Sequence, residues 1–368
     1  MRMIGKRTAF LAAAAAVGLL VSACGGGHKT ASTPTTAPAT QGTLTAGAPS
    51  GCKTASQNGN VAALPGFQVC LFAAATTTSN HADSVVLAGS DVFIGWQNVT
   101  AKDGTDTKTS TISEYTTGGK LLKSWSVRGH NDGMRVDPTT HLLWVMCNED
   151  GAPRLYTIDP AGTAVKKYSL PPTPHGGGFD DIQFTNGLAL IDASNPSLNS
   201  GGNNVFPALY KVQLSGSKAL LTSVLKGNAK ALTLNVPVTT QTLNLTDPDS
   251  MMIDPQGDLV LDDQGDNQLL FIRNVGTPSQ QVKVLSVGTQ VDDSAWATSS
   301  KGCLLVADGN VGIYSVCSSV WVPGTVYTAA PNDFTVIGFI GTINMANGAI
   351  TPVIVGIANP HGMAFVPQ

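Results

Sequence analysis

The sequence predicts an all-β fold, and in particular a β-propeller with six blades. Short apolar runs bounded by Gly, Asp, Asn and Pro are typical of strands joined by tight turns. Such runs occur at Asp91–Trp96, His141–Met146, Asp258–Asp262 and Cys303–Ala307. The body of the chain has no long apolar stripe of helical period, and 40 Gly with only 12% charged residues favour a compact β protein with many turns.

A recurring motif divides the chain into intervals of about one blade each. In each copy an acidic residue or a histidine, usually followed by a small residue, precedes alternating apolar positions. The copies begin at Asp83, Asp132, Asp180, Asp249, Asp293 and His361. The intervals between them are 49, 48, 69, 44 and 68 residues. Since a four-stranded blade occupies about 40 to 50 residues, the two long intervals predict insertions, which we place at Ser194–Pro207 and Ser318–Asp333.

The last copy of the motif begins only seven residues before Gln368, so its strand needs partners from elsewhere in the chain. Phe67–Phe72 can supply one of them. A ring closed by N-terminal and C-terminal strands has no exposed sheet edges, which otherwise promote aggregation. We therefore favour six blades. Five or seven remain open, because residues 52–80 are short for three strands.

The N-terminus has the pattern of a bacterial lipoprotein signal peptide, residues 1–23, with the lipid attached at Cys24. Basic residues precede an apolar run, Ala9–Leu20, and small residues lead to the cysteine. The run has about 12 residues, whereas a membrane-spanning helix needs ~20. An ordinary signal peptide cut after Ala23 is the alternative. Two acyl chains on Cys24 would suffice for stable anchoring.

Residues 24–51 form a segment rich in Thr, Pro and Gly that contains no aromatic side chain. Such a segment cannot bury enough apolar surface to offset its ordering entropy, so we expect a disordered tether. Residues 52–368 would then form a single propeller domain. The lipid predicts an extracytoplasmic location at the cell membrane, with the lipid as the only membrane contact. Removing three signal-peptide cations from a formal net charge of −3 leaves −6, which argues against nucleic acid as a partner.

The motif residues are candidates for a metal or polar site at one mouth of the central channel. If each copy marks the start of an inner strand, its first side chain projects toward that mouth. Five carboxylates in one ring repel one another. They require a hard cation such as Ca²⁺, with its six to eight oxygen ligands, or else raised pKa values and abundant water. The alternative is structural, since Asp before a small residue commonly forms a turn with its own backbone.

Two segments resemble the inner strand, turn and second strand of the NHL and SMP-30 (gluconolactonase-like) six-bladed propellers. They are Asn131–Pro138, followed by Leu143–Val145, and Asp249–Val260. Pro360–Pro367 resembles the closing strand of such proteins. In the lactonase-like members, carboxylate and amide residues at the starts of inner strands bind a divalent metal on the axis, and one Asp assists as base.

On this resemblance Asp132 and Asp249 take the matching positions, as metal ligands or base of a Ca²⁺-dependent hydrolase. The chain departs from the family pattern, because Asp83 stands where the first-blade Glu is expected and Asp180-Asp181 replaces an Asn-Gly pair. We therefore favour a non-catalytic propeller that binds a small molecule or an envelope protein, with the hydrolase as the alternative.

Two further predictions concern the cysteines and an acidic segment. Cys303 and Cys317 flank a turn at 308–310, so antiparallel pairing would place them opposite each other as a disulfide. The pairing of Cys52, Cys70 and Cys147 is left open; a Cys52–Cys70 bond would leave Cys147 alone and buried. Asp262–Asn267 carries three carboxylates between strands. It fits a solvated turn, with a surface Ca²⁺ site as the alternative.

Overall fold

The computed structural model describes residues 53–54, 61–331 and 337–368. The predicted signal peptide 1–23, the lipid site Cys24, the tether 24–51 and Cys52 lie outside the described residues. Within the described ranges, the helical content is a single 3-10 turn, η2 (Gln264–Asp266). None of the helices described there has the length and apolarity that crossing a bilayer requires.

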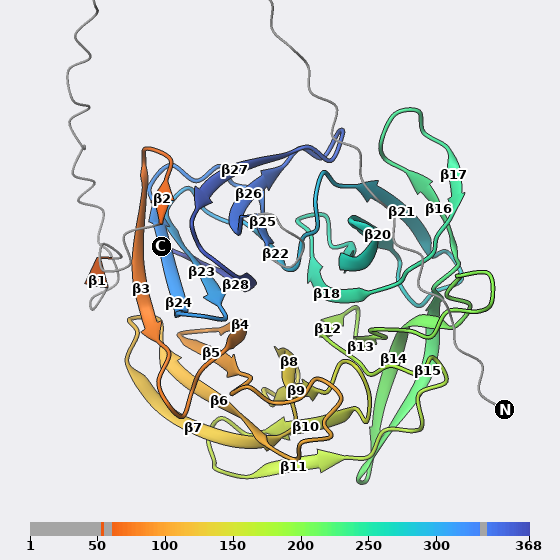
Figure 1. Cartoon of the computed structure of the whole chain (residues 1–368), viewed down its shortest axis with the longest axis horizontal. Helices are drawn as coiled ribbons and strands as arrows, with labels where there is room; N and C mark the ends of the chain where they lie inside the picture. The colour runs from red at the N-terminus through yellow and green to blue at the C-terminus, as the bar shows by residue number, and fades with distance from the viewer. Residues whose placement is uncertain (1–52, 55–60, 332–336) are drawn as a thin grey trace, which may run out of the picture. The chain divides into compact units, whose positions relative to one another are not determined.

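Six sheets stand side by side as the blades of a propeller (Figure 1). From the inner strand outward, blade 1 consists of β4 (Ala82–Ala88), β5 (Asp91–Trp96), β6 (Thr109–Thr116) and β7 (Leu121–Arg128). Blade 2 consists of β8 (Asn131–Val136), β9 (Leu143–Cys147), β10 (Arg154–Ile158) and β11 (Val165–Tyr168). Blade 3 consists of β12 (Ile182–Thr185), β13 (Leu188–Asp192), β14 (Pro207–Ser215) and β15 (Lys218–Lys226).

The remaining three blades take additional strands at their outer edges. Blade 4 consists of β18 (Pro248–Ile253), β19 (Leu259–Asp263), β20 (Gln268–Arg273), β21 (Gln281–Ser286), β16 (Lys230–Thr233) and β17 (Thr240–Thr242). Blade 5 consists of β22 (Ser294–Trp296), β25 (Val326–Ala330), β26 (Phe339–Ile343), β27 (Ile350–Val355) and β2 (Ala62–Ala63). Blade 6 consists of β28 (Pro360–Pro367), β23 (Gly302–Asp308), β24 (Gly312–Ser318), β3 (Phe67–Ala74) and β1 (Lys53–Thr54).

The inner strands close the ring, because β28 contacts both β22 and β4. Blade 6 contains strands from both ends of the chain: β28 is its innermost strand, and β3 lies toward its outer edge beside β24. Figure 1 shows β3, in orange, lying against the blue strands of the C-terminal region. The predicted six blades and the predicted closure by N-terminal and C-terminal strands are therefore confirmed, and rings of five or seven blades are excluded.

The 68-residue interval contains a strand exchange between blades 5 and 6. The β23–β24 hairpin follows β22 of blade 5 in the chain, yet it pairs between β28 and β3 of blade 6. The chain then returns to complete blade 5 with β25. The insertion expected at Ser318–Asp333 is wrong in this respect, since β25 within that range is a regular strand. The extra residues are the hairpin, which blade 6 needs because its outer and inner strands come from opposite ends of the chain.

The 69-residue interval contains two extra segments. The loop predicted at Ser194–Pro207 joins β13 to β14, as expected. The β16–β17 hairpin was not expected; it adds to the outer edge of blade 4 through a parallel pairing of β16 with β21.

Apolar clusters pack where neighbouring blades meet. Between blades 5 and 6, the buried Trp321 packs edge-to-face on Phe67, Tyr327 and Phe365. Its indole N–H donates to the Gly302 carbonyl at 2.8 Å. Aromatic pairs of this kind contribute about 0.5–1.5 kcal/mol each beyond their buried area. Trp321 thus joins strands from both ends of the chain at the closure of the ring.

The small residue of the motif is required by the next inner strand. The Gly133 N–H donates to the Asp180 carbonyl at 2.9 Å, and a Cβ on Gly133 would lie 2.3 Å from the Cα of Asp181. At the sixth copy, a Cβ on Gly362 would lie 2.3 Å from the carbonyl oxygen of Asp83. Side chains at these two positions would push adjacent blades apart.

The predicted Cys303–Cys317 disulfide is confirmed. The two cysteines are directly opposed in the β23–β24 pairing, with Cα atoms 4.0 Å apart. Cys70 also takes part in a disulfide. Cys147 is buried and is a free thiol in the described part of the chain.

Candidate functional site

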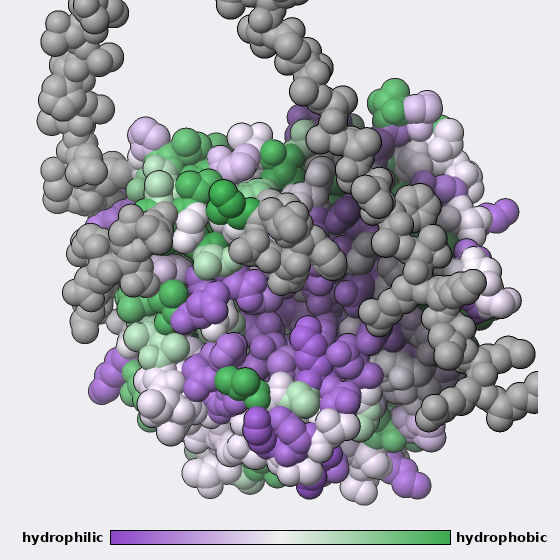
Figure 2. All heavy atoms as spheres, in the orientation of Figure 1, coloured by the Kyte–Doolittle hydropathy of each residue, from purple (hydrophilic) through white to green (hydrophobic). Residues whose placement is uncertain are grey.

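All six motif side chains line one cavity of about 260 Å³. Hydrophilic residues gather around the hollow centre of the ring in Figure 2. The six residues are Asp83, Asp132, Asp180, Asp249, Asp293 and His361. The sequence motif therefore identifies the residues that the fold brings together at one mouth of the channel.

Backbone irregularities turn the motif residues toward the channel. In blades 1, 2 and 4 the pairing between the inner strand and its neighbour is interrupted at the motif, for example between Asn131 and Met134. Residues within such a bulge leave the regular ladder, and the bulge redirects their side chains. The acidic residue of the motif lies inside each of these three interruptions.

Asp293 has the structural role that the turn alternative describes. One of its carboxylate oxygens accepts the N–H of Ser294 at 2.7 Å, and the other accepts the N–H of Met363 in the next blade at 2.7 Å. Asp181 likewise accepts the Met251 N–H of the next blade at 2.9 Å. These two carboxylates link adjacent inner strands. Because their oxygens already accept backbone N–H groups, fewer of their lone pairs are available to a ligand.

Burial raises the pKa values of the carboxyls at the mouth. Desolvation raises the pKa of Asp83 to about 7 against the opposing effect of His361. The pKa values of Asp132, Asp180 and Asp249 lie well above the ordinary range for the same reason, and neighbouring carboxylates raise all three further. The repulsion that the sequence predicts is therefore present, and cation binding would relieve it.

Two cations of the chain offset part of this negative charge. Lys102 places its ammonium 2.6 Å from Glu149; desolvation lowers the pKa of Lys102, but the salt bridge outweighs this effect and holds that pKa above its ordinary value. Arg135 donates to Asp181 at 2.7 Å, to the Ile182 carbonyl at 3.0 Å and to the Met251 carbonyl at 2.9 Å. Arg135 thereby links blades 2, 3 and 4 through these hydrogen bonds, whereas Lys102 extends from an exposed loop toward the cavity.

His361 forms the one motif position with a nitrogen side chain. Its Nδ1 lies 2.6 Å from a carboxylate oxygen of Asp292, and its Nε2 lies 2.7 Å from the amide nitrogen of Asn359. Gln264 also donates to Asp292, at 3.3 Å. A carboxylate that holds an imidazole in this way fixes the orientation of the ring toward the cavity.

Glu149, Lys102 and Asp292 are part of the cavity wall and were not identified from the sequence. Glu149 follows β9, the second strand of blade 2. Because β9 runs antiparallel to β8, the end of β9 lies beside the start of β8, at the same mouth. Gln97 in blade 1 and Gln264 in blade 4 follow their second strands in the same way and also line the cavity, so a polar residue at this position is a signal that the sequence contains.

The acidic segment Asp262–Asn267 is buried at its start and exposed at its end, so the predicted solvated turn is confirmed only for its second half. Asp262 and Asp263 end β19, the second strand of blade 4, and both are fully buried rather than solvated. Neither oxygen of Asp262 has a hydrogen-bond partner in the described structure, and burial raises its pKa well above the ordinary range. Asp262 and Asp263 thus belong to the buried interior of blade 4, whereas Gly265, Asp266 and Asn267 form the exposed turn that the sequence predicts.

Three carboxylates at the mouth are arranged as a cation site would require. Glu149, Asp180 and Asp249 offer oxygens that lie within 4.8 Å of one another. Burial, followed by the neighbouring carboxylate of Asp249, raises the pKa of Asp180, and a cation between the two acids would oppose this effect. In the same cavity, Oδ2 of Asp132 is buried without a hydrogen-bond partner among the described residues. An all-oxygen set of this kind fits Ca²⁺.

No protein family model matches the chain, and no curated protein matches it. Among solved structures it is similar to virginiamycin B lyase from Staphylococcus aureus, at 13% identity over 82% of this chain and 93% of that one, with a TM-score of 0.49. A putative gluconolactonase is 11% identical over 84% and 88% of the chains, with a TM-score of 0.42. A putative 6-phosphogluconolactonase from Bacteroides uniformis is 10% identical over 83% and 87%, with a TM-score of 0.45. None of these likenesses is close enough to carry an activity over to this chain.

Proposed function

We propose that this protein is a lipid-anchored, extracytoplasmic β-propeller that binds a small, oxygen-rich molecule in its central mouth through a divalent cation. The observation that carries the proposal is the carboxylate group of Glu149, Asp180 and Asp249 on the wall of the mouth cavity. Asp180 is buried and Glu149 and Asp249 are partly buried, so three carboxylates close together are costly, and a bound cation would remove that cost.

The cavity wall offers groups suited to a polar ligand beside the cation. A bound Ca²⁺ would attract carboxylate, hydroxyl or carbonyl oxygens of the ligand. Lys102, Gln97 and Asn359 supply N–H groups on the same wall. The volume of about 260 Å³ admits a small molecule and excludes a folded partner. We therefore favour a sugar-like or carboxylate-bearing ligand.

Catalysis is a second candidate, which the Asp292–His361 pair favours. An imidazole oriented by a carboxylate is the usual arrangement of a general base. His361 lies in the same cavity as Asp132 and Asp249, the positions that the resemblance to the SMP-30 family assigns to a hydrolase. In a lactonase-like reaction, a bound divalent cation would supply Lewis-acid chemistry, and Nε2 of His361 would accept a proton from water after exchanging its contact with Asn359 for that water.

The cellular location rests on the N-terminal pattern. A lipid on Cys24 and the tether 24–51 would keep the propeller at the outer surface of the cell membrane, free to reach small molecules or envelope proteins. We expect replacement of Cys24 by Ser to release the protein from the membrane fraction. Unchanged membrane association of that variant would contradict lipid anchoring.

The function is tested by thermal denaturation of the full chain with a panel of sugar acids, sugars and lactones, with and without Ca²⁺. We expect a ligand to raise Tm only with Ca²⁺, and the effect to be lost in Asp180→Asn/Asp249→Asn but kept in Asp159→Asn, a substitution in an exposed turn. Ligand stabilisation that needs neither Ca²⁺ nor these carboxylates would contradict the proposal. Lactone hydrolysis that His361→Gln abolishes would establish the second candidate, and absence of turnover would reject it.

A further inference from the structure

His130 is buried at the mouth with one ring nitrogen held by the backbone. Its Nδ1 lies 2.9 Å from both the carbonyl oxygen and the hydroxyl of Thr100. That hydroxyl donates to the Gln97 carbonyl at 2.7 Å, so its hydrogen is already used. Both Thr100 oxygens must therefore accept, and Nδ1 carries a hydrogen. In a neutral ring, the lone pair then resides on Nε2.

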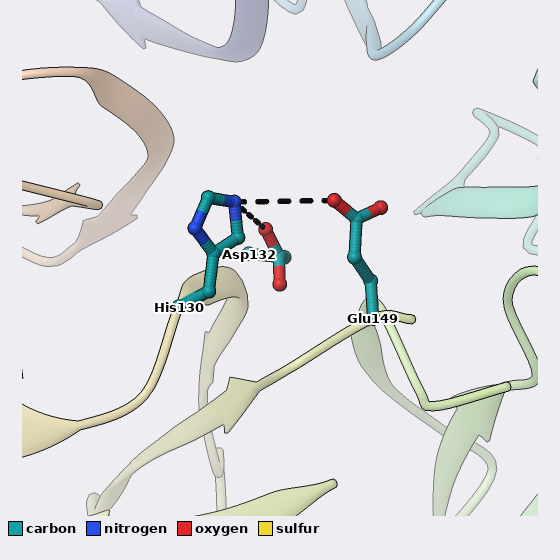
Figure 3. A group of neighbouring side chains, drawn as sticks. All are labelled: His130, Asp132 and Glu149. Carbon is teal, nitrogen blue, oxygen red and sulfur yellow. Dashed lines mark ion pairs between the residues drawn. The ribbon is translucent and has the colours of Figure 1, made fainter. Parts of the chain in front are cut away.

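This Nε2 faces two carboxylates. It lies 3.3 Å from Oδ1 of Asp132 and 3.9 Å from Oε1 of Glu149. Dashed lines mark both pairs in Figure 3. It makes no hydrogen bond within the described part of the chain, and neither does Oδ2 of Asp132. His130 and Asp132 are each only 5% exposed, so water does not readily satisfy these atoms. Lone pairs that converge in a buried space repel one another unless a cation or a proton lies among them.

We infer that His130, Asp132 and Glu149 form a second metal site, selective for a transition metal ion such as Zn²⁺, Mn²⁺ or Co²⁺. Oxygens of the two carboxylates and a ring nitrogen lie within 4.8 Å of one another. One imidazole with two carboxylates is a donor set that suits these ions, whereas Ca²⁺ takes oxygen ligands. This donor set separates the site from the all-oxygen group.

The surroundings of the site hold its ligands in place. Thr100 fixes the ring of His130 through Nδ1, and Gln97 donates to Oδ1 of Asp132 at 3.0 Å. Partners that orient metal ligands in this way typically contribute about 10- to 100-fold to affinity. The Lys102 ammonium, 2.6 Å from Glu149, is the competing cation. Because this side chain is 60% exposed, it can withdraw into solvent when a metal ion binds.

Glu149 belongs to both groups, and through this residue the inference rests on the proposed function. The carboxylate can bridge two ions, one bound by His130 and Asp132 and the other by Asp180 and Asp249. Paired metal ions that share a carboxylate clamp a substrate from two sides. The two sites nevertheless have separate ligands, so they can be tested apart.

The test is a Co²⁺ titration of the untagged, metal-stripped full chain, followed by visible absorption, since Co²⁺ absorption reports the ligands of the ion. We expect stoichiometric binding that weakens by about 10-fold or more in His130→Gln and in Asp132→Asn. Binding should persist in Asp249→Asn and in the control His141→Gln, which alters an exposed histidine. Circular dichroism of each variant verifies that it folds. If either His130→Gln or Asp132→Asn fails to fold, the other variant still tests the site.

Each outcome decides between the two metal sites. Loss of Co²⁺ in His130→Gln with Ca²⁺ binding intact supports the nitrogen site, whatever the fate of the proposed function. Loss of Ca²⁺ binding in Asp249→Asn alone supports only the all-oxygen group of Glu149, Asp180 and Asp249. Unchanged Co²⁺ absorption in both His130→Gln and Asp132→Asn would overturn the inference. So would a ¹⁵N NMR spectrum in which His130 Nε2 stays protonated at neutral pH with Co²⁺ replaced by saturating Zn²⁺, because the ring would then be an imidazolium paired with Asp132.

Discussion

The Lys102 ammonium lies 2.6 Å from Oε1 of Glu149, the one residue that both candidate metal groups share. Lys102 comes from an exposed loop of blade 1, whereas Glu149 follows the second strand of blade 2. An exposed side-chain cation therefore lies beside the carboxylate that both groups share. We interpret Lys102 as the counter-charge of the cation-free state.

Removal of this ammonium should make the mouth more dependent on a metal ion. We expect Lys102→Gln to lower Tm by a few degrees in EDTA at pH 7.5, and to increase the Tm rise that saturating Ca²⁺ produces. The physical reason is that the carboxylates lose a neighbouring cation that a metal ion replaces. Differential scanning calorimetry measures both quantities. Lys167→Gln, at an exposed position of β11, is the control; equal Ca²⁺ effects in the two variants would contradict this role of Lys102.

The stability of the cation-free protein should fall as pH rises. Burial raises the pKa values of Asp83 and Asp293 to about 7 from an ordinary value of 3.8, so between these values the folded state holds protons that the unfolded chain has lost. The free energy of unfolding then decreases from about pH 4 to pH 7 and levels off above. Burial lowers the pKa of His130 to about 4, and this acts in the opposite direction below pH 6.5, but it is one group against several carboxyls.

Urea denaturation in EDTA at pH 5.5 and pH 7.5 measures this dependence. We expect the lower free energy of unfolding at pH 7.5, and we expect Ca²⁺ to stabilise the protein at pH 7.5 much more than at pH 5.5, where protons already neutralise the acids. Equal or greater stability at pH 7.5 without a divalent cation would show that burial does not raise the pKa values of the mouth carboxyls.

The glycine of the motif in blade 2 should be intolerant of a side chain. A Cβ on Gly133 would lie 2.3 Å from Asp181 Cα and 2.4 Å from the Asp180 carbonyl oxygen. We expect Gly133→Ala to cost about 2–3 kcal/mol, in the range of overpacked cores. In the control Gly151→Ala, where the nearest atom is 3.8 Å away, we expect a change within ~0.5 kcal/mol. Similar stabilities of the two variants by urea denaturation would refute the close approach of blades 2 and 3.

The Cys303–Cys317 disulfide should stabilise the exchanged hairpin. It joins β23 and β24, which belong to blade 6 although they lie between two strands of blade 5 in the sequence. We expect Cys303→Ala/Cys317→Ala to lose about 2–3 kcal/mol of stability, because the unfolded chain regains freedom between the two positions. The comparison is with Cys147→Ala, which removes a buried free thiol and no crosslink. A double variant as stable as wild type would show that the strand pairing alone holds the hairpin.

The inner strands were predictable because each carries the same local pattern. Asp83, Asp132 and Asp249 begin similar stretches of sequence, and similar local sequence gives a similar bulge at the same mouth of the ring. The disulfide was predictable for a related reason, since both cysteines belong to one hairpin.

The rest depends on contacts between residues distant in sequence. Nothing local to Gly302–Ser318 states that this hairpin pairs with Phe67–Ala74 rather than with its chain neighbours. Glu149 lies outside the motif copies that we singled out, and only the antiparallel geometry of blade 2 brings it beside His130 and Asp132. The burial of Asp262 likewise follows from the closed ring, not from its polar sequence neighbours.

We expect above all that the carboxylates of the mouth bind a divalent cation. Isothermal titration of the metal-stripped full chain with Ca²⁺, beside the Asp180→Asn/Asp249→Asn variant, tests it most directly. We predict saturable, stoichiometric binding to the wild-type protein and none to the variant, which should also be more stable than the wild type in EDTA because two strained acids are gone. Absence of Ca²⁺ binding to the wild type, or equal binding to the variant, would contradict the account.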